Sequence, residues 1–431
     1  MGTTLSTPIT DEAGAQVEAP SACAASAGVA AMQGWRPTME DAHDLRIEHV
    51  STAAQECVPL LWACVLDGHG GEACATASAA QLWEAVMTTG AWRAAAPIEH
   101  ATHLVSVLQS ALQDGFMAQD ARLRSVHDAQ TADAGTRPLP QGAGTVVGSG
   151  TTVVSAIVTP THLVWANAGD SRVTLIKTGA RAVELSRDHK PYHEHELARI
   201  KGAGGSVWNK RVLGVLAVSR GLGDFEFKSS ADTAARAQMV TALPDTGARA
   251  RDADDAFLLL ACDGVWDVMS NDAAAAFLTR AHASIKSARG LARALIQEAL
   301  RLKSRDNLSA LVVILGADAA SASAAAEPVE TAAAKTVAQE AEREAAEAAA
   351  ALAAAEEDQR ATEQRLRAEV AQRRREAMGT ALAAGSPAHT HTHTHTHTHT
   401  HVASAAAGGQ DAPPLPSTAV RRETWDRLAS L

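Results

Sequence analysis

The chain has 431 residues, of which 46% are hydrophobic, so it can form one large domain or two medium ones with a substantial core. The formal net charge of −11 argues against a general nucleic-acid binder, because contacts to a phosphate backbone need clustered Lys and Arg. No run of about 18 apolar residues could span a membrane, and we expect no secretory signal because the N-terminus lacks a basic segment followed by an apolar one.

The N-terminal residues 1–22 are small and polar, and we predict that they are flexible. They begin MGTTLS, which fits the pattern for myristoylation of Gly2, although so short a motif also arises by chance. One acyl chain holds a membrane only weakly, and no basic residue precedes Arg36 to strengthen the contact. Acylation of Gly2 with weak membrane association, and a chance match, are both left open.

Residues 23–317 alternate apolar runs with turns rich in Gly, Asp and Asn, which predicts one folded domain. The expected strands are residues 60–66, 151–158, 162–166, 172–177, 257–262 and 309–315. The expected helices are residues 72–87, 98–124, 193–202 and 272–303. Because strand follows strand with few intervening helices between residues 150 and 186, the pattern favours antiparallel sheets over a doubly wound parallel fold.

The cysteines of the chain stand at irregular spacings, at Cys23, Cys57, Cys64, Cys74 and Cys262. Their odd number does not suggest a disulfide framework, and the absence of a CxxC pair does not suggest zinc. We expect buried free thiols in a reducing compartment, and therefore a cytoplasmic or nuclear location.

The composition changes after residue 317. Residues 318–384 are rich in Ala, Glu and Arg, which favours a solvated helix over a coiled coil because large apolar residues are few. Residues 385–418 read as a low-complexity linker, in which His and Thr alternate from 389 to 401. A metal-scavenging tract is one reading of this repeat, and a translated CA dinucleotide repeat is the favoured one. Residues 419–431 could form a short amphipathic helix or a frayed end.

Two apolar strands end in the same way. The run at residues 60–66 is followed by Asp67-Gly68-His69, and the run at 257–262 by Asp263-Gly264. A buried strand fixes its last side chain, and the glycine lets the backbone turn and expose a carbonyl oxygen. A carboxylate beside a bare carbonyl suits a hard cation, although either Asp-Gly alone would be an ordinary β-turn.

Three further acidic turns stand beside predicted strands: Asp306 in RDN, Asp170 in GDSR, and the pair Glu40-Asp41. Acidic residues at the ends of several strands can converge on one edge of a sheet. Unpaired carboxylates gathered in this way would repel each other and be driven to protonate, and bound divalent cations remove that conflict. The pattern therefore favours a metal centre that polarises water and holds a phosphoryl group.

Taken together, these segments resemble the type 2C, or metal-dependent, protein serine/threonine phosphatases. The matching segments occur in the family's order and are QGWRPTMEDAH (33–43), VLDGHG (65–70), SGTTV (149–153), NAGDSR (167–172), DHKP (188–191), GGSV (204–207), LAVSRGLGDF (216–225), LACDGVWDV (260–268) and RDNLS (305–309). Each segment alone is a weak signal, but nine in order form a specific one. The fold class implied is α+β, a central sandwich of two antiparallel β-sheets flanked by α-helices on both sides.

The resemblance also implies a metal centre with two Mg²⁺ or Mn²⁺ ions and a weaker third. The expected ligands are Asp67 as the bridging carboxylate, the Gly68 carbonyl, Asp263, Asp306 and Glu40, with Asp41 close behind and Asp170 and Asp267 at the third ion. Arg36 matches the arginine that binds the substrate phosphate, and His69 matches the proposed general acid.

The activity that the resemblance implies is hydrolysis of phosphoserine and phosphothreonine in proteins by a metal-activated bridging water, with Asp67 among the catalytic residues. Such an enzyme would act in signalling on phosphoprotein substrates, and we expect a monomer. The alternative is a catalytically weak or inactive regulatory module with the same fold, which would be expected to lose metal-binding acids. Three segments depart from the family pattern. Leu213 stands where Asn or Asp is frequent, residues 228–240 are polar and Ala-rich where the family carries a variable flap, and residues 240–245 resemble the family's Pro-Glu element only loosely.

Overall fold

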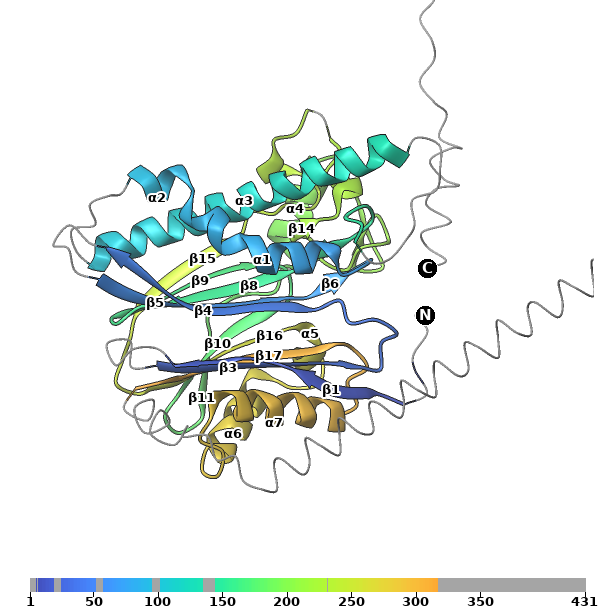
Figure 1. The fold of residues 1–431 in the computed structure, drawn as a ribbon. Coiled ribbons are helices and arrows are strands. Elements are labelled where there is room, and N and C mark those ends of the chain that lie inside the picture. Colours follow the sequence, from blue (N-terminus) through green and yellow to red (C-terminus); the bar gives the residue numbers. More distant parts are fainter. Residues whose placement is uncertain are drawn as a thin grey trace, which may run out of the picture. The chain divides into compact units, whose positions relative to one another are not determined.

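The computed structural model describes residues 5, 7–18, 25–51, 57–94, 101–134, 144–230 and 232–316. The predicted helical tail, the His-Thr linker, the terminal helix at 419–431 and the acylation site at Gly2 all lie outside these residues. Within them, two antiparallel sheets face each other and helices cover the outer face of each sheet (Figure 1). This architecture confirms the predicted fold class.

The first sheet contains the N-terminal strands and the last strand of the described region. In spatial order it runs β1 (Ile9–Ala13), β3 (Ala25–Gly34), β17 (Leu308–Leu315), β16 (Asp255–Ala261), β10 (Arg172–Lys177) and β11 (Arg181–Glu184), with β2 (Gln16–Glu18) also paired to β3. All of these pairings are antiparallel. Because β1 and β2 pair with β3, the flexible segment predicted for residues 1–22 is wrong over 9–13 and 16–18, whose backbone groups are held by the sheet.

The second sheet runs β15 (Asp245–Ala250), β9 (His162–Ala168), β8 (Val153–Val158), β5 (Cys57–Leu66) and β4 (Ala42–Ser51). Two small ribbons lie apart from it: β14 (Leu222–Gly223), β7 (Gly150–Thr151) and β6 (Gly68–His69) form one, and β12 (Val207–Trp208) and β13 (Arg211–Val212) form the other. The small ribbon that contains β6 continues the chain directly from the end of β5.

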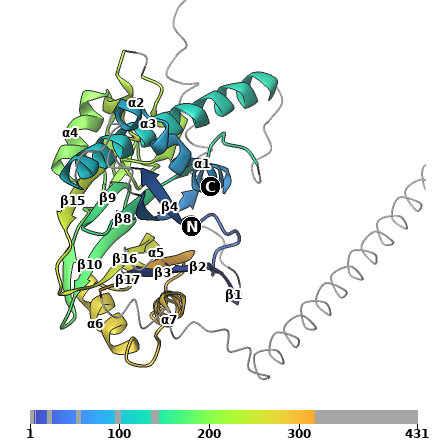
Figure 2. The same ribbon diagram turned by 60° about the vertical axis from the view of Figure 1, so that its left-hand side comes forward.

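The helices form the two outer layers, seen from a second direction in Figure 2. On the second sheet lie α1 (Ala73–Met87) and α3 (Ala101–Ala134), with the short α2 (Gly90–Ala94) beside them, and on the first sheet lie α6 (Asn271–Ala281) and α7 (Ala288–Arg301). The remaining helical segments are α4 (Glu194–Gly202), α5 (Asp263–Trp266) and the 3-10 turns Phe225–Phe227 and Ala235–Ala237. The single helix predicted for residues 272–303 is two helices, because Ser270 and Ser287 each cap a new helix through the side-chain oxygen.

The packing explains why the central strands are continuous apolar runs. Along β5, Leu60 and Trp62 face the helices, whereas Leu61 and Val65 face the other sheet, and all four are fully buried. Successive side chains of a strand point to opposite faces, so a strand covered on both faces needs apolar residues at every position. The core between the sheets holds the ends of β5 and β16 in fixed positions, and the acidic turns follow directly from those ends.

No helix within the described ranges has the length and apolar character that crossing a membrane requires.

Candidate active site

The turn after β5 is held in place by two other segments of the chain. The carbonyl oxygen of Asp67 accepts hydrogen bonds from Thr152 N at 2.9 Å and Thr151 Oγ1 at 3.1 Å. At Gly68, a Cβ atom would lie 2.1 Å from the carbonyl oxygen of Glu40, a distance that no real side chain tolerates. The absence of a side chain at Gly68 therefore lets the Glu40 backbone approach Asp67, which brings two of the acidic turns together.

Acids from three strand ends meet at this edge of the sandwich. Asp67 follows β5, Asp170 follows β9, and Asp263 begins α5 directly after β16. Each of these three acids offers a carboxylate oxygen, and the three oxygens all lie within 4.8 Å of one another. In a second group, carboxylate oxygens of Asp41 and Asp67 and the Sγ atom of Cys262 also lie within 4.8 Å of one another. The convergence expected from the turns is therefore present for these four acids.

The electrostatics of the cluster are unfavourable for bare carboxylates. Burial, with the charges of Asp263 and Asp41, raises the pKa of the Asp67 carboxyl well above its usual range. Burial likewise raises the pKa of Asp41 to about 7, against the hydrogen bond that Ser309 Oγ donates at 2.7 Å. Burial and the charges of Asp170 and Asp306 raise the pKa of Asp263 to about 8.

These acids fit a divalent cation. Carboxylate oxygens are the ligands that Mg²⁺ and Mn²⁺ favour, and a cation stabilises the ionised form that burial and mutual repulsion disfavour. In addition, the buried Oδ1 atom of Asp41 accepts no hydrogen bond from a nitrogen or oxygen donor of the described residues, which leaves an open acceptor beside Asp67. Buried acceptors in native structures are ordinarily satisfied, so this atom also points to a cation or to ordered water at the site.

Four other predicted site residues line a groove of about 560 Å³ that adjoins the cluster. Its lining includes Arg36, Glu40, Asp267 and Asp306. Arg36 is half exposed, and its Nη2 atom donates to Asp306 Oδ2 at 2.6 Å. Burial lowers the pKa of Arg36, but the hydrogen bond and charge of Asp306, with more distant Asp67 and Asp263, raise it overall. The arginine is therefore a fixed cation at the mouth of the acidic cluster.

Asn307 holds the two walls of this groove together. Its side-chain amide donates to Gln33 O at 2.8 Å and to Thr38 O at 3.0 Å, while its Oδ1 accepts from Glu40 N at 2.9 Å. The segment that carries Arg36 is thus fixed to the segment that carries Asp306. Asn307 was not among the predicted site residues, although it directly follows Asp306 in the RDN turn that the sequence analysis identified.

His69 has a partner that the sequence analysis also did not assign. Its Nε2 atom lies 2.8 Å from Oδ1 of Asp224, which is 4% exposed and has a left-handed backbone with φ of 52°. Burial lowers the pKa of His69, but the charge and hydrogen bond of Asp224 outweigh it and raise the pKa. Asp224 lies in the segment LAVSRGLGDF, so the motif was visible, but the contact spans 155 residues and could not be read from spacing.

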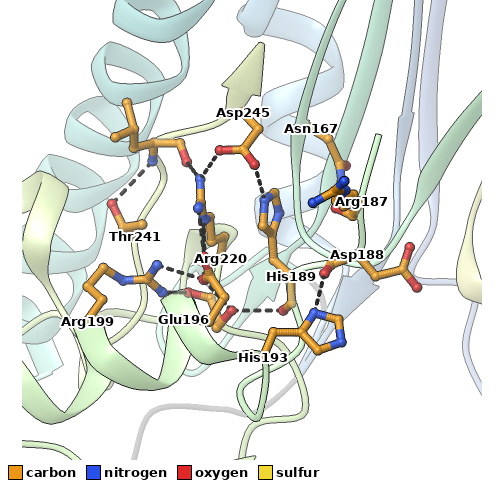
Figure 3. Close-up of polar contacts among 12 residues, drawn as sticks. Asn167, Arg187, Asp188, His189, His193, Glu196, Arg199, Arg220, Thr241 and Asp245 are labelled. Carbon is orange, nitrogen blue, oxygen red and sulfur yellow. Dashed lines mark hydrogen bonds and ion pairs between the residues drawn. The ribbon is translucent and has the colours of Figure 1, made fainter. Parts of the chain in front are cut away.

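A second unassigned contact lies at Asp170, whose Oδ2 accepts a short hydrogen bond from Lys190 Nζ. The loop that carries Lys190 is anchored by the polar network in Figure 3. The Nε2 atom of His189 lies 3.1 Å from Asp245 in that network. On the other side of the ring, Nδ1 accepts from Gly169 N at 3.1 Å. The residue before Asp170 is therefore tied to β15 through one buried imidazole.

Glu196 is the centre of the same network. Its carboxylate accepts from Arg199 and Arg220 at 2.6 Å each (Figure 3). It also accepts from Ser219 Oγ at 2.6 Å. Burial alone would raise the pKa of Glu196, but the hydrogen bonds and charges of the two arginines lower it to about 2. Glu196 lies on α4, so this buried ion network ties that helix to the segment that carries Ser219 and Arg220.

The fold and the site together define a class of protein: an α-β-β-α sandwich with a candidate divalent-metal centre at one edge of its two sheets. The family model described as Protein phosphatase 2C matches residues 25–308, about two thirds of the chain. The chain belongs to the protein phosphatase 2C family.

Several curated proteins are similar to this region. Protein phosphatase 2C homolog 2 of Aspergillus flavus is 38% identical over 288 residues, covering 65% of this chain and 59% of the relative. Protein phosphatase ppm-1.A of Caenorhabditis elegans is 33% identical over 293 residues, covering 66% and 58%. Human Protein phosphatase 1B is 32% identical over 289 residues, covering 66% and 56%. The chain spans less than two thirds of the length of these three relatives.

Two solved structures from Toxoplasma gondii share the fold. One, a phosphatase, is 23% identical with a TM-score of 0.55 and covers 71% of this chain and 96% of its own. The other, a serine-threonine phosphatase 2C, is 21% identical with a TM-score of 0.54 and covers 70% and 99%. At this level of identity the likeness bears on the fold alone.

Proposed function

We propose that the protein hydrolyses phosphoserine and phosphothreonine in phosphoproteins, with Mg²⁺ or Mn²⁺ as cofactor. The observation that carries the proposal is the meeting of Asp67, Asp170 and Asp263 within 4.8 Å, next to a groove that presents Arg36. A cation site beside a fixed guanidinium suits a dianionic phosphoryl group. Membership of the phosphatase family supports the same conclusion.

The acids have distinct roles in this proposal. Two principal ions would be held by Asp67, the Gly68 carbonyl, Asp263, Asp306 and Glu40, with Asp41 close behind, and Asp170 and Asp267 would hold a weaker third. When bound, the ions would activate the attacking water and offset the negative charge of the phosphoryl group. Asp67 is central because it belongs to both acidic groups of the cluster.

Arg36 would bind the phosphate. Its guanidinium is half exposed, and the single Nη2 contact to Asp306 leaves other N–H groups to donate to phosphate oxygens. Because Asp306 fixes one side of the guanidinium, little side-chain freedom is lost when a phosphate binds. Arg36→Lys should therefore raise KM more than a change at an ordinary surface arginine, since lysine lacks the planar fork.

His69 would act as the general acid that protonates the leaving serine or threonine oxygen. With Nε2 donating to Asp224, the imidazolium has its transferable proton at Nδ1. After the proton transfer, the neutral ring keeps its hydrogen on Nε2, from which it still donates to Asp224. The raised pKa keeps a larger fraction of His69 protonated near neutral pH than an isolated histidine would have.

No cysteine side chain whose burial is described is accessible as a nucleophile, because Cys64, Cys74 and Cys262 are all buried. This favours direct hydrolysis over a thiol-phosphate intermediate. The cytoplasmic or nuclear location, the role in signalling, the monomeric state and the acylation of Gly2 stay predictions from the sequence.

The proposal is tested by phosphate release from phosphoserine, phosphothreonine and phosphotyrosine peptides, with MnCl₂ and with EDTA. We expect turnover of the first two peptides with metal and none with chelator. Full activity in EDTA would overturn the metal-dependent reading. No activity on any peptide with either Mg²⁺ or Mn²⁺ would favour the regulatory module instead.

A further inference from the structure

Two cations in the groove beside Arg36 have no role in the proposed chemistry. Lys303 and Arg305 lie on the loop between α7 and β17, and both line the groove of about 560 Å³. Both residues are exposed. Within the described part of the chain, neither side chain has a hydrogen bond or an ion pair.

The backbone of Lys303 is unusual for a lysine. Its φ is 71°, in the left-handed region, at the residue that ends the turn after α7. Lys303 N donates to Leu300 O at 2.9 Å and Ser304 N donates to Ala299 O at 3.1 Å, which is the Schellman pattern that normally has glycine at this position. A non-glycine residue here is strained, and such strain is typical of positions kept for function. Glycine at this position would relieve the strain, so lysine is not the residue that backbone stability favours.

The loop that presents these cations is rigid. Ser304 is buried, and its Oγ donates to Gly264 O at 2.7 Å, which ties the loop to α5. Two residues after Arg305, Asn307 ties the same loop to the segment that carries Arg36. Cations held on a fixed backbone lose less conformational entropy on binding an anion than cations on a mobile loop.

The groove contains more cations than its acidic residues pair with. Its carboxylates, on Glu40, Asp267 and Asp306, are the proposed metal ligands, and Arg36 is already paired with Asp306. Lys303 and Arg305 are the cations that no acid of the described chain satisfies. Both line the same groove as Arg36, which is the arginine proposed to bind the phosphate.

We propose that this groove is a subsite for an anionic side chain next to the phosphoserine or phosphothreonine, and that Lys303 and Arg305 are specificity-determining residues. The ligand chemistry is a carboxylate of Asp or Glu, or a second phosphate. The proposal rests on the proposed function, because it concerns which phosphopeptides the same site selects. It predicts a preference for acidic or doubly phosphorylated segments over neutral ones.

The test compares three phosphopeptides that differ only at residues next to the phosphothreonine, which are Gln, Glu or a second phosphoserine. The readout is kcat/KM for each peptide relative to the Gln peptide, for the full chain and for Lys303→Gly, Lys303→Glu and Arg305→Gln. Glycine suits the left-handed backbone, so Lys303→Gly removes the charge without threatening the fold. The matched control is Lys286→Gln, an exposed lysine outside the groove lining.

We expect the full chain and the control to prefer the anionic peptides, through KM more than kcat. Each neutralised cation should reduce that preference by roughly three- to fivefold, because the contacts are partly exposed. Lys303→Glu, which places a negative charge in the groove, should reverse the preference in favour of the Gln peptide. A larger loss for the Glu peptide assigns the subsite to carboxylates, and a larger loss for the doubly phosphorylated peptide assigns it to phosphate.

A second readout does not depend on turnover. Fluorescence anisotropy of the same labelled peptides, bound to Asp263→Asn with and without Lys303→Gly, should show the same loss of affinity for anionic peptides. An unchanged ratio of affinities and of kcat/KM in Lys303→Gly and Arg305→Gln would overturn the subsite, while leaving the proposed function intact. If no peptide is hydrolysed by the full chain, the proposed function fails and anisotropy alone decides on the groove.

Discussion

Replacing Asp263 with Asn should stabilise the metal-free protein while it removes activity. The substitution keeps the shape of the side chain and deletes one negative charge from the cluster of Asp67, Asp170 and Asp263. A folded-state pKa of about 8, against an ordinary value of 3.8, means that the folded chain binds a proton that the unfolded chain releases. The contribution of Asp263 to the stability of the metal-free wild type should therefore be most favourable below about pH 4 and should fall as the pH rises towards 8.

The magnitude follows from the same shift. At about 1.4 kcal/mol per pKa unit, a shift of about four units costs the folded wild type up to roughly 5 kcal/mol near pH 7.5. Asp263 is partly open to solvent and its neighbours share the repulsion, so we expect about 1–3 kcal/mol to be recovered. The gain should be present at pH 7.5 and nearly absent at pH 4.

The assay is urea unfolding in EDTA at pH 4 and pH 7.5, with phosphopeptide turnover measured on the same samples. Asp128→Asn, an acid with a 63% exposed side chain on α3, serves as the control and should change neither quantity. With saturating MnCl₂ the order should reverse, because the wild type gains binding energy that the variant lacks. The reasoning would be refuted if Asp263→Asn unfolded more easily than wild type in EDTA at pH 7.5, or gained the same stability at both pH values.

Three further predictions concern the general acid, the buried ion network and the tail. His69→Gln should reduce turnover of phosphopeptides by orders of magnitude but that of p-nitrophenyl phosphate much less, since p-nitrophenolate leaves without a proton; equal losses would argue against the general acid. The pKa of the Glu196 carboxyl is about 2 in the folded chain against an ordinary 4.5, so its ionised form should contribute up to about 3 kcal/mol of stability above pH 4.5, which is lost as the pH falls through 2. Glu196→Gln should therefore lower the free energy of unfolding in urea at pH 7 and weaken its decline between pH 4.5 and pH 2. A decline parallel to that of the wild type would contradict this. A chain ending near Asp318 should keep the melting temperature and turnover of the full chain, and a severalfold change reproduced by Trp425→Ala would instead show that the terminus docks.

Part of the fold was predictable because burial leaves a strong signal. The runs at β5 and β16 were found because strands covered on both faces must be apolar at every position, and Asp67 and Asp263 mark where they end. By contrast, β3 was missed because its sequence ASAGVAAMQG has small residues that rarely favour strands. The structure gives the reason: a Cβ at Gly28 would lie 2.1 Å from the backbone of α7, so this strand needs small residues where the helix packs.

The site was predictable as a set of turns but not as a set of contacts. We expected the turns of Asp67, Asp170 and Asp263 to converge because each stands at the end of a strand. The grouping of their carboxylate oxygens agrees with that expectation. The partner of His69 was not predictable, because Asp224 is 155 residues away in the sequence. In addition, the motif LGDF does not predict the left-handed backbone at Asp224. Roles for individual residues came from the resemblance to a family, which spacing alone could not have supplied.

The central claim, that the acids at the edge of the two sheets form the divalent-metal site of a protein phosphatase, is tested most directly by calorimetric titration of the metal-free chain with MnCl₂. The titration is run at pH 7 in two buffers of different ionisation enthalpy. We predict saturable binding that releases protons, because Asp41 and Asp263, with pKa values of about 7 and 8, must give up their protons to the metal; the release should shrink at pH 9. Binding should be lost in Asp67→Asn. Absence of saturable binding, or unchanged binding in Asp67→Asn, would contradict the account.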